Sequence, residues 1–258
     1  MKRLARWLGI ALLAGVTLVG TEKPADAASI AIVQGSFYTS NLRNSLIAAG
    51  QSVTEISSYT AASLASFDAV IQYGNSFVDF AELETYVSNG GRLIETPWLW
   101  LNFSPPTNLQ VFTNGGVPSF SEPYPGVSVL DPSNYLLNGV TFPAGPGGFD
   151  IGRPTGNAFA AGATGLVNWA DGTAMFGPRS LGLGEIVGLN MHLITSDTPF
   201  MVIDQPWATQ LVVNAATGAA VGASDVAPVP EPTSMVLLGS GLAAAAAARR
   251  RRSRGAKA

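Results

Sequence analysis

Few side chains in this sequence could carry out a reaction. The chain has no cysteine and a single histidine, His192, which excludes thiol nucleophiles and leaves little imidazole chemistry. Glu95 is the best-placed acid, because it ends a short apolar segment and ligands bind beyond the carboxyl ends of strands in open parallel sheets. Glu95 and His192 are therefore the candidate catalytic residues. Two other acids, Asp68 and Glu185, begin predicted strands and would lie at the opposite edge.

A catalytic role for either candidate would need a partner. Glycoside hydrolysis uses two carboxylates that flank the bond, and a histidine base needs a nucleophile within hydrogen-bond reach. The sequence identifies no such partner and no strained serine elbow. Acids in the predicted loops also lack the spacing of a calcium-binding loop, so we expect no metal and no cofactor; they are Asp150, Asp171, Asp197 and Asp204.

Aromatic and polar side chains follow several of the predicted strands. Aromatic faces together with hydroxyls and amides suit a sugar, whose C–H face stacks and whose hydroxyls exchange hydrogen bonds. The alternative is that these rings only cover the rim and the core of the sheet. Asn190 and His192 follow a late strand at the same edge. The candidate ligand-binding residues are Ser36, Tyr38, Asn75, Ser76, Trp98 and Trp100.

The elements that position these residues are clearest in the first hundred residues. Residues 30–33 form a short apolar segment typical of a strand buried in a parallel sheet, and residues 67–73 and 92–95 are two further predicted strands. Residues 52–56 alternate like an edge or half-covered strand. Helices are predicted from Ser40 to Ala49, with Gly50 as the stop, and from Phe80 to Val87, ended by Asn89-Gly90-Gly91, with a helical turn at residues 60–65. This order predicts an α/β fold with a mainly parallel sheet flanked by helices.

The rest of the body is less regular. Residues 101–165 are rich in proline and glycine, which predicts a loop-rich insertion on the surface, with residues 127–130 and 135–137 packed onto the core. Asp171-Gly172 then marks the turn of a hairpin, residues 185–190 a buried strand, and residues 206–216 a closing helix. We expect one domain over residues 28–218 and a small-residue linker over residues 219–228.

Both ends of the chain carry basic residues next to a short apolar segment. Lys2, Arg3 and Arg6 precede an apolar segment at residues 7–20, and Ala25-Asp26-Ala27 offers small residues for cleavage, so residues 1–27 are predicted to be a secretory signal removed by signal peptidase. At the other end, residues 229–258 combine Pro230-Glu231-Pro232, an apolar segment and a cluster of arginines. That apolar segment is shorter than the roughly 20 residues of a permanent span.

This tail resembles the PEP-CTERM sorting signal, in which all three parts occur in the same order. The resemblance implies an exosortase as partner, a Gram-negative host that makes extracellular polysaccharide, and transient insertion of the tail helix in the inner membrane. It also implies that the tail is then removed and the body is released or attached at the cell surface. The alternative is a plain single-span anchor. The resemblance implies nothing about the activity of the body.

The charge of the exported body argues against some partners. Between Ala28 and Asp225 there are four arginines, no lysine and fourteen acidic residues, which gives a net charge of −10. An acidic body without a basic cluster does not suit nucleic acid or an anionic membrane. Because an exported chain without cysteine has no disulfides, its stability must come from a buried core.

The pattern of the body is similar to the class I glutamine amidotransferase-like fold, a superfamily that includes ThuA-like proteins and non-catalytic domains of glycosidases. The similarity rests on residues 69–71, 83–95, 131–140 and 182–187. Catalytic members carry a cysteine on the sharp turn after the strand that here ends at Glu95, where this chain has Thr96-Pro97-Trp98. The resemblance therefore extends to the fold and not to the amidotransferase reaction.

Three functions remain open from the sequence. The first is an exported surface or matrix protein without enzymatic activity that binds polysaccharide through the rim aromatics. The second is an extracellular hydrolase of a glycan or ester that uses Glu95 or His192. The third is a structural spacer that binds no ligand. We expect the first.

Overall fold

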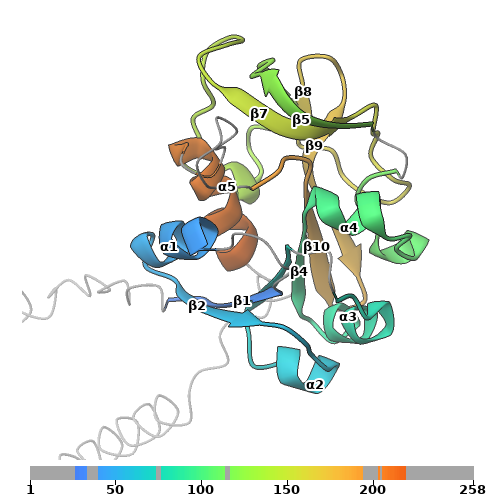
Figure 1. Ribbon diagram of the computed structural model, residues 1–258. Helices are drawn as coiled ribbons and strands as arrows, with labels where there is room; N and C mark the ends of the chain where they lie inside the picture. The colour runs from blue at the N-terminus through green and yellow to red at the C-terminus, as the bar shows by residue number, and fades with distance from the viewer. Residues whose placement is uncertain are drawn as a thin grey trace, which may run out of the picture.

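A computed structural model describes residues 27–33, 40–73, 77–113, 117–193, 203 and 205–218, with the backbone alone for residues 118–121 (Figure 1). Its strands are β1 Ser29–Val33, β2 Ser52–Ile56, β3 Ala69–Gln72, β4 Arg92–Glu95, β5 Val117–Pro123, β6 Val127–Val129, β7 Asp150–Thr155, β8 Val167–Trp169, β9 Ala174–Leu181 and β10 Gly184–Leu189. Eight of them form one sheet in the order β2-β1-β3-β4-β10-β9-β8-β6, and β5 pairs with β7. The strands from β2 to β10 in that order are parallel, and β9, β8 and β6 are antiparallel to their neighbours.

Helices cover both faces of the parallel part of this sheet. The helices are α1 Ser40–Ala48, α2 Ala61–Leu64, α3 Phe80–Ser88, α4 Pro97–Asn102 and α5 Pro206–Thr217, with 3-10 turns η1 Thr107–Leu109 and η2 Tyr135–Leu137. Side chains of β1 alternate between two cores: Ile30 and Ile32 join the core with α1 and α5, while Ala31 and Val33 join the core with α2, α3 and α4. Burial on both faces explains why four consecutive residues of β1, from Ile30 to Val33, are apolar. The predicted α/β fold with a mainly parallel sheet is confirmed.

Local signals set the ends of the helices. Asp79 caps α3, because its Oδ1 accepts hydrogen bonds from the N–H groups of Ala81 and Glu82 at 3.1 and 3.2 Å. After α3 the chain turns through Gly90, whose φ of +104° favours glycine, and enters β4 directly. This link enters β4 at its amino end, so Glu95 at the other end of the strand lies at the edge of the sheet where ligands bind in such folds.

Residues 101–165 are rich in loops, as predicted, and contribute more to the core than the sequence indicated. Tyr124, Leu136 and Ile151 from this segment are fully buried and belong to the core that includes α1 and α5. β6 extends the main sheet at its edge, and β5 and β7 form their own pair. The predicted hairpin at Asp171-Gly172 is confirmed, although β9 continues to Leu181, beyond the predicted end of the hairpin.

Candidate functional site

The carboxyl edge of β4 is the place where the sequence predicted chemistry. Here the strand passes at once into α4, with Thr96 as its N-cap and Pro97 as its first residue. The Thr96 side chain does not cap the helix. It is fully buried, and its Oγ1 donates a hydrogen bond to the backbone oxygen of Gln72 at 2.9 Å. The hydroxyl thus ties the end of β4 to β3 and does not face solvent.

Glu95 is buried in the core formed with α2, α3 and α4, with 1% of its surface exposed. Its Oε2 accepts a hydrogen bond from the N–H of Val111 at 3.1 Å, and within the described residues its Oε1 has no hydrogen-bond partner. Desolvation raises the pKa of this carboxyl to about 8, against the lowering effects of the Val111 hydrogen bond and the Arg179 charge. Glu95 is therefore mainly a neutral acid at pH 7. Through this hydrogen bond to Val111, Glu95 holds the segment that follows η1 against β4.

The described residues next to Glu95 are closely packed. In the sheet, Glu95 lies in register with Gln72 of β3 and Gly188 of β10. A Cβ on Gly188 would lie 2.7 Å from Cβ of Val111 and 2.5 Å from the ring of Phe112, so the loop after η1 rests directly on this strand. Glycine at position 188 allows this close approach. The neighbourhood of Glu95 is a packed core.

The two candidate tryptophans of α4 lie in different environments. Trp100 is 5% exposed and its ring centroid is 5.0 Å from that of Phe112, so it belongs to the core. The expectation that Trp100 contacts a ligand at the rim therefore needs correction, because its ring is covered. Trp98 is half-buried, and its ring lies 4.8 Å from that of His192 at an interplanar angle of 37°. Of the two, Trp98 is the one that is partly exposed, as contact with a sugar requires.

His192 follows β10 and is fully buried. The backbone N–H of His192 donates a hydrogen bond to the backbone oxygen of Gly152 at 2.7 Å, and a Cβ on Gly152 would lie 2.9 Å from Cδ2 of the imidazole. Desolvation lowers the pKa of the imidazole to about 4, so His192 is neutral at pH 7. The neutral imidazole packs between β7 and the ring of Trp98. An acid–base catalyst has a pKa near the working pH, so the low pKa of His192 does not suit that role.

β7 covers the carboxyl end of β10. The buried side chain of Asn190 donates hydrogen bonds through Nδ2 to the oxygens of Pro154 and Ala174 at 3.2 and 2.7 Å. The backbone oxygen of Asn190 accepts a further hydrogen bond from Nε1 of Trp169 at 3.2 Å. Together with the His192–Gly152 bond, these contacts close the end of β10. The sequence placed Asn190 at this edge but did not predict the strand that covers it.

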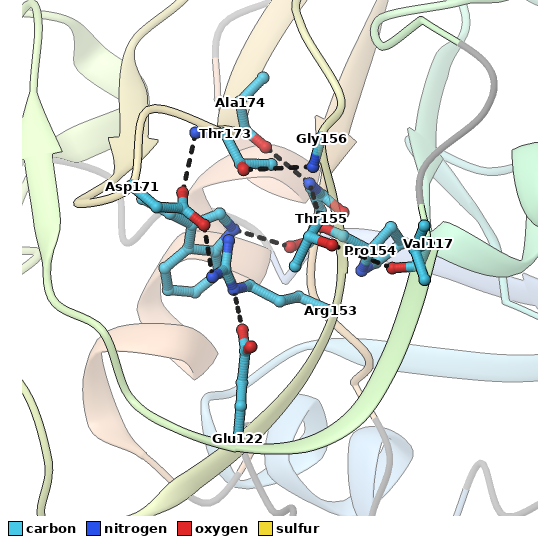
Figure 2. A network of polar contacts seen from close by, with 11 residues as sticks. Val117, Glu122, Arg153, Pro154, Thr155, Gly156, Asp171, Thr173 and Ala174 are labelled. Carbon is cyan, nitrogen blue, oxygen red and sulfur yellow. Dashed lines mark hydrogen bonds and ion pairs between the residues drawn. The ribbon is translucent and has the colours of Figure 1, made fainter.

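A charged network on β7 was missed by the sequence analysis (Figure 2). Arg153, 3% exposed, forms ion pairs with Glu122 of β5 and with Asp171 of the hairpin turn, the latter at 2.7 Å, and lies 5.2 Å from the centre of the Trp169 ring. The Arg153 and Thr173 hydrogen bonds lower the pKa of Asp171, although partial burial raises it. Arg153 thus joins β5, β7 and the β8–β9 turn, and both carboxylates serve this structural contact.

The other predicted site residues lie outside the described residues. These are the ligand-binding candidates Ser36, Tyr38, Asn75 and Ser76 and the sorting motif Pro230-Glu231-Pro232, together with the loop acids Asp197 and Asp204. Across the described part of the chain, no cluster of three or more histidine, aspartate or glutamate side chains could hold a metal ion. None of the helices in that same part is long and apolar enough to cross a membrane.

Comparison with known proteins supports the two resemblances. The PEP-CTERM protein-sorting motif matches residues 228–252, which marks the chain as an exosortase substrate exported to the cell envelope or surface. No curated protein sequence matches the chain. Among solved structures, a ThuA-like protein from Parabacteroides merdae is similar at 10% identity and a TM-score of 0.53, over 75% of this chain and 91% of that one.

Two further structures share the fold. A cytoplasmic protein from Salmonella typhimurium matches at 12% identity and a TM-score of 0.53, over 73% of this chain and 97% of that one. A cold-adapted β-galactosidase from Rahnella sp. R3 matches at 14% identity and a TM-score of 0.51, over 74% of this chain and 31% of the enzyme. At such low identity these matches show the fold alone. They confirm the class I glutamine amidotransferase-like fold of the body.

Proposed function

Because this chain joins an exosortase-sorting motif to a ThuA-like body, we propose that it is a non-enzymatic component of the cell surface or extracellular matrix that binds polysaccharide through Trp98. In this proposal residues 1–27 are removed by signal peptidase. The tail enters the inner membrane of a Gram-negative host only until exosortase has processed it. The body, residues 28–218, is the part that remains outside the cell.

The observation that carries the proposal is the burial of Thr96 in the turn after β4. Where catalytic members of the superfamily would place a nucleophile, this chain has Thr96, which is fully buried and donates its hydroxyl hydrogen to Gln72. A nucleophile must reach its substrate and have a base within hydrogen-bond distance. The Thr96 hydroxyl contacts a backbone oxygen in the core instead.

Trp98 supports the binding part of the proposal. It is half-buried on α4, at the carboxyl edge of the parallel strands, and its ring is held by the neighbouring ring of His192. An aromatic ring held in this way loses little conformational entropy when a ligand stacks on it. The acidic charge of the body favours a neutral or cationic glycan at this ring over an anionic one.

One observation favours the alternative, an extracellular hydrolase. The raised pKa of Glu95 leaves its carboxyl protonated near pH 7, as a general acid must be. Its 1% exposure argues against this role, because a substrate would have to displace the segment at Val111 to reach it. We therefore rank the binder first and separate the two by experiment.

The test measures both retention and turnover on the extracellular polysaccharide of the host. Purified protein should co-sediment with the polysaccharide, and Trp98→Ala should weaken this binding by about fivefold or more, as expected for a central aromatic contact. Phe80→Ala, which removes a half-buried aromatic ring of α3, is the matched control and should bind as the wild type does. Trp98→Phe should retain part of the binding.

Two results would contradict the proposal. Equal binding by the wild type and Trp98→Ala would remove Trp98 from the contact. Release of reducing sugars by the wild type and loss of this activity in Glu95→Gln would establish the hydrolase instead.

A further inference from the structure

A concave surface lies at the opposite edge of the sheet from Trp98. A pocket of about 760 Å³ opens between α2 and α3, where β3 and β4 begin. Figure 1 shows these two helices next to each other at the lower end of the view. Superfamily resemblance places function at the carboxyl ends of the strands, so this pocket belongs to no site described above.

Small residues make the pocket wide. Ala61 and Ala62 line it from α2, Ala65 lines it just after that helix, and Gly90 and Gly91 line it after α3. A Cβ on Gly91 would overlap the ring of Tyr86, so this ring packs directly on the backbone of Gly91. The hydroxyl of Tyr86 accepts a hydrogen bond from the N–H of Arg92 at 3.2 Å and donates to the oxygen of Phe67 at 3.3 Å, which fixes the ring. Phe67, half-buried, adds a second aromatic ring.

The charge of the pocket has one sign. Asp68 and Glu82 line it, and no lysine or arginine is among its lining residues. Asp68 is exposed and its Oδ2 accepts a hydrogen bond from the N–H of Ser29 at 2.7 Å; Glu82 is half-buried and its Oε2 accepts from the N–H of Ala61. Each carboxylate has about four lone-pair sites, so both retain capacity for a ligand. The charge of Asp68 reaches the pocket floor, where it helps desolvation to raise the pKa of Tyr86 to about 12.

These features together select a class of ligand. The two carboxylates attract a cation, while the exposed side chains of Thr85 and Asn89 can exchange hydrogen bonds with hydroxyl groups. The volume is far larger than one metal ion needs, and the described residues offer no cluster of three metal-binding side chains. A polysaccharide of uronic acids would meet repulsion from both carboxylates.

We propose that the pocket between α2 and α3 is a binding site for an amino sugar, whose ammonium group pairs with Asp68 and Glu82 and whose ring lies over Phe67. The site is independent of the Trp98 contact, because the two lie at opposite edges of the sheet. A protein with both sites could hold two glycan chains at once.

The probe is a hexamer of β-1,4-linked glucosamine, measured by calorimetry with the purified protein at low salt. The fully N-acetylated hexamer has the same backbone without the positive charge and should bind at least about fivefold more weakly, because the ion pairs are lost. Asp68→Asn and Glu82→Gln keep an acceptor oxygen for Ser29 and Ala61 and should each weaken binding of the charged hexamer about fivefold. Ala62→Leu should block the pocket without a change of charge.

The control variant removes one negative charge from α3, the helix that also carries Glu82. Glu84 lies on α3 and accepts a hydrogen bond from Asn108 at 2.6 Å; it does not line the pocket, so Glu84→Gln should bind as the wild type does. Equal weakening in Glu84→Gln would show attraction to the acidic body as a whole and overturn the proposal. No binding of the charged hexamer, or equal binding of the N-acetylated one, would also overturn it. Trp98→Ala should leave this binding unchanged, which separates the pocket from the proposed function.

Discussion

Arg92 and Glu185 lie in register on the neighbouring parallel strands β4 and β10, and they form an ion pair at 3.1 Å in which each side chain is 4% exposed. Nη1 of Arg92 also donates to the oxygen of Ala215 in α5 at 3.2 Å. Glu185 in turn accepts a hydrogen bond from the hydroxyl of Tyr135 at 2.6 Å. One buried pair thus connects two strands, the closing helix and the turn η2.

Removing one partner of this pair should destabilise the fold strongly. In Glu185→Ala the charge of Arg92 stays buried without Glu185, and the free energy of unfolding should fall by about 3–5 kcal/mol. Urea unfolding followed by circular dichroism measures this change. The double variant with Arg92→Met and Glu185→Leu removes both charges and should recover much of the loss. If the single and double variants are equally unstable, the burial of the Arg92 charge is not the cause.

Glu95 should make the fold less stable as pH rises. Its pKa in the folded state is about 8, above its ordinary value of 4.5, so between these values the folded state holds more protons than the unfolded state. The free energy of unfolding should therefore decrease with increasing pH in this window, by at most about 1.4 kcal/mol per pH unit. Glu95→Gln keeps an oxygen that can accept from Val111 and should lack this slope. An unchanged slope in urea titrations of the variant would show that Glu95 is ionised in the fold.

His192 should act in the opposite direction. Its pKa in the folded state is about 4, below its ordinary value of 6.5, so the unfolded state takes up a proton first as pH falls. Stability from this residue should be complete above pH 6.5 and should be lost by at most about 1.4 kcal/mol per unit as pH falls toward 4. Because this is the only histidine, its ring signal in proton NMR reports the pKa directly. A midpoint near 6.5 would contradict its burial against Trp98 and β7.

The slopes of Glu95 and His192 oppose each other between about pH 4.5 and 6.5, where both groups titrate differently in the folded and unfolded states. The wild type should therefore show little net pH dependence from these two groups in that range. Each effect should appear separately once the other group is removed, in Glu95→Gln or in His192→Gln. This comparison also tests whether the two pKa values are independent.

Local signals in the sequence were enough to predict the parallel half of the sheet. The central residues of β1, β3 and β4 are apolar because both faces of these strands are covered, and the turn after α3 contains Gly90, where φ is positive. The predicted edge position of β2 also agrees with the strand order. Each of these features depends on neighbours close in the sequence.

The second half depends on contacts that are distant in the sequence. β5 and β7 pair across about thirty residues, and Arg153 holds them in place. Their sequences do not have the pattern of strands, because they contain Pro118, Pro123 and Pro154. α4 was also missed, although a proline at its first position after Thr96 is a known start signal for a helix. The burial of Glu95 and His192 follows from Val111 and Gly152, which belong to this unpredicted half.

The fate of the two ends of the chain tests the account most directly. Intact-mass measurement of the protein from its host should find a surface or secreted form that begins near Ala28 and has lost the residues after the sorting motif at Pro230-Glu231-Pro232. A host without exosortase should keep the tail on the protein. Recovery of the protein from the cytosol of the normal host, with all 258 residues present, would contradict both its export and its proposed place outside the cell.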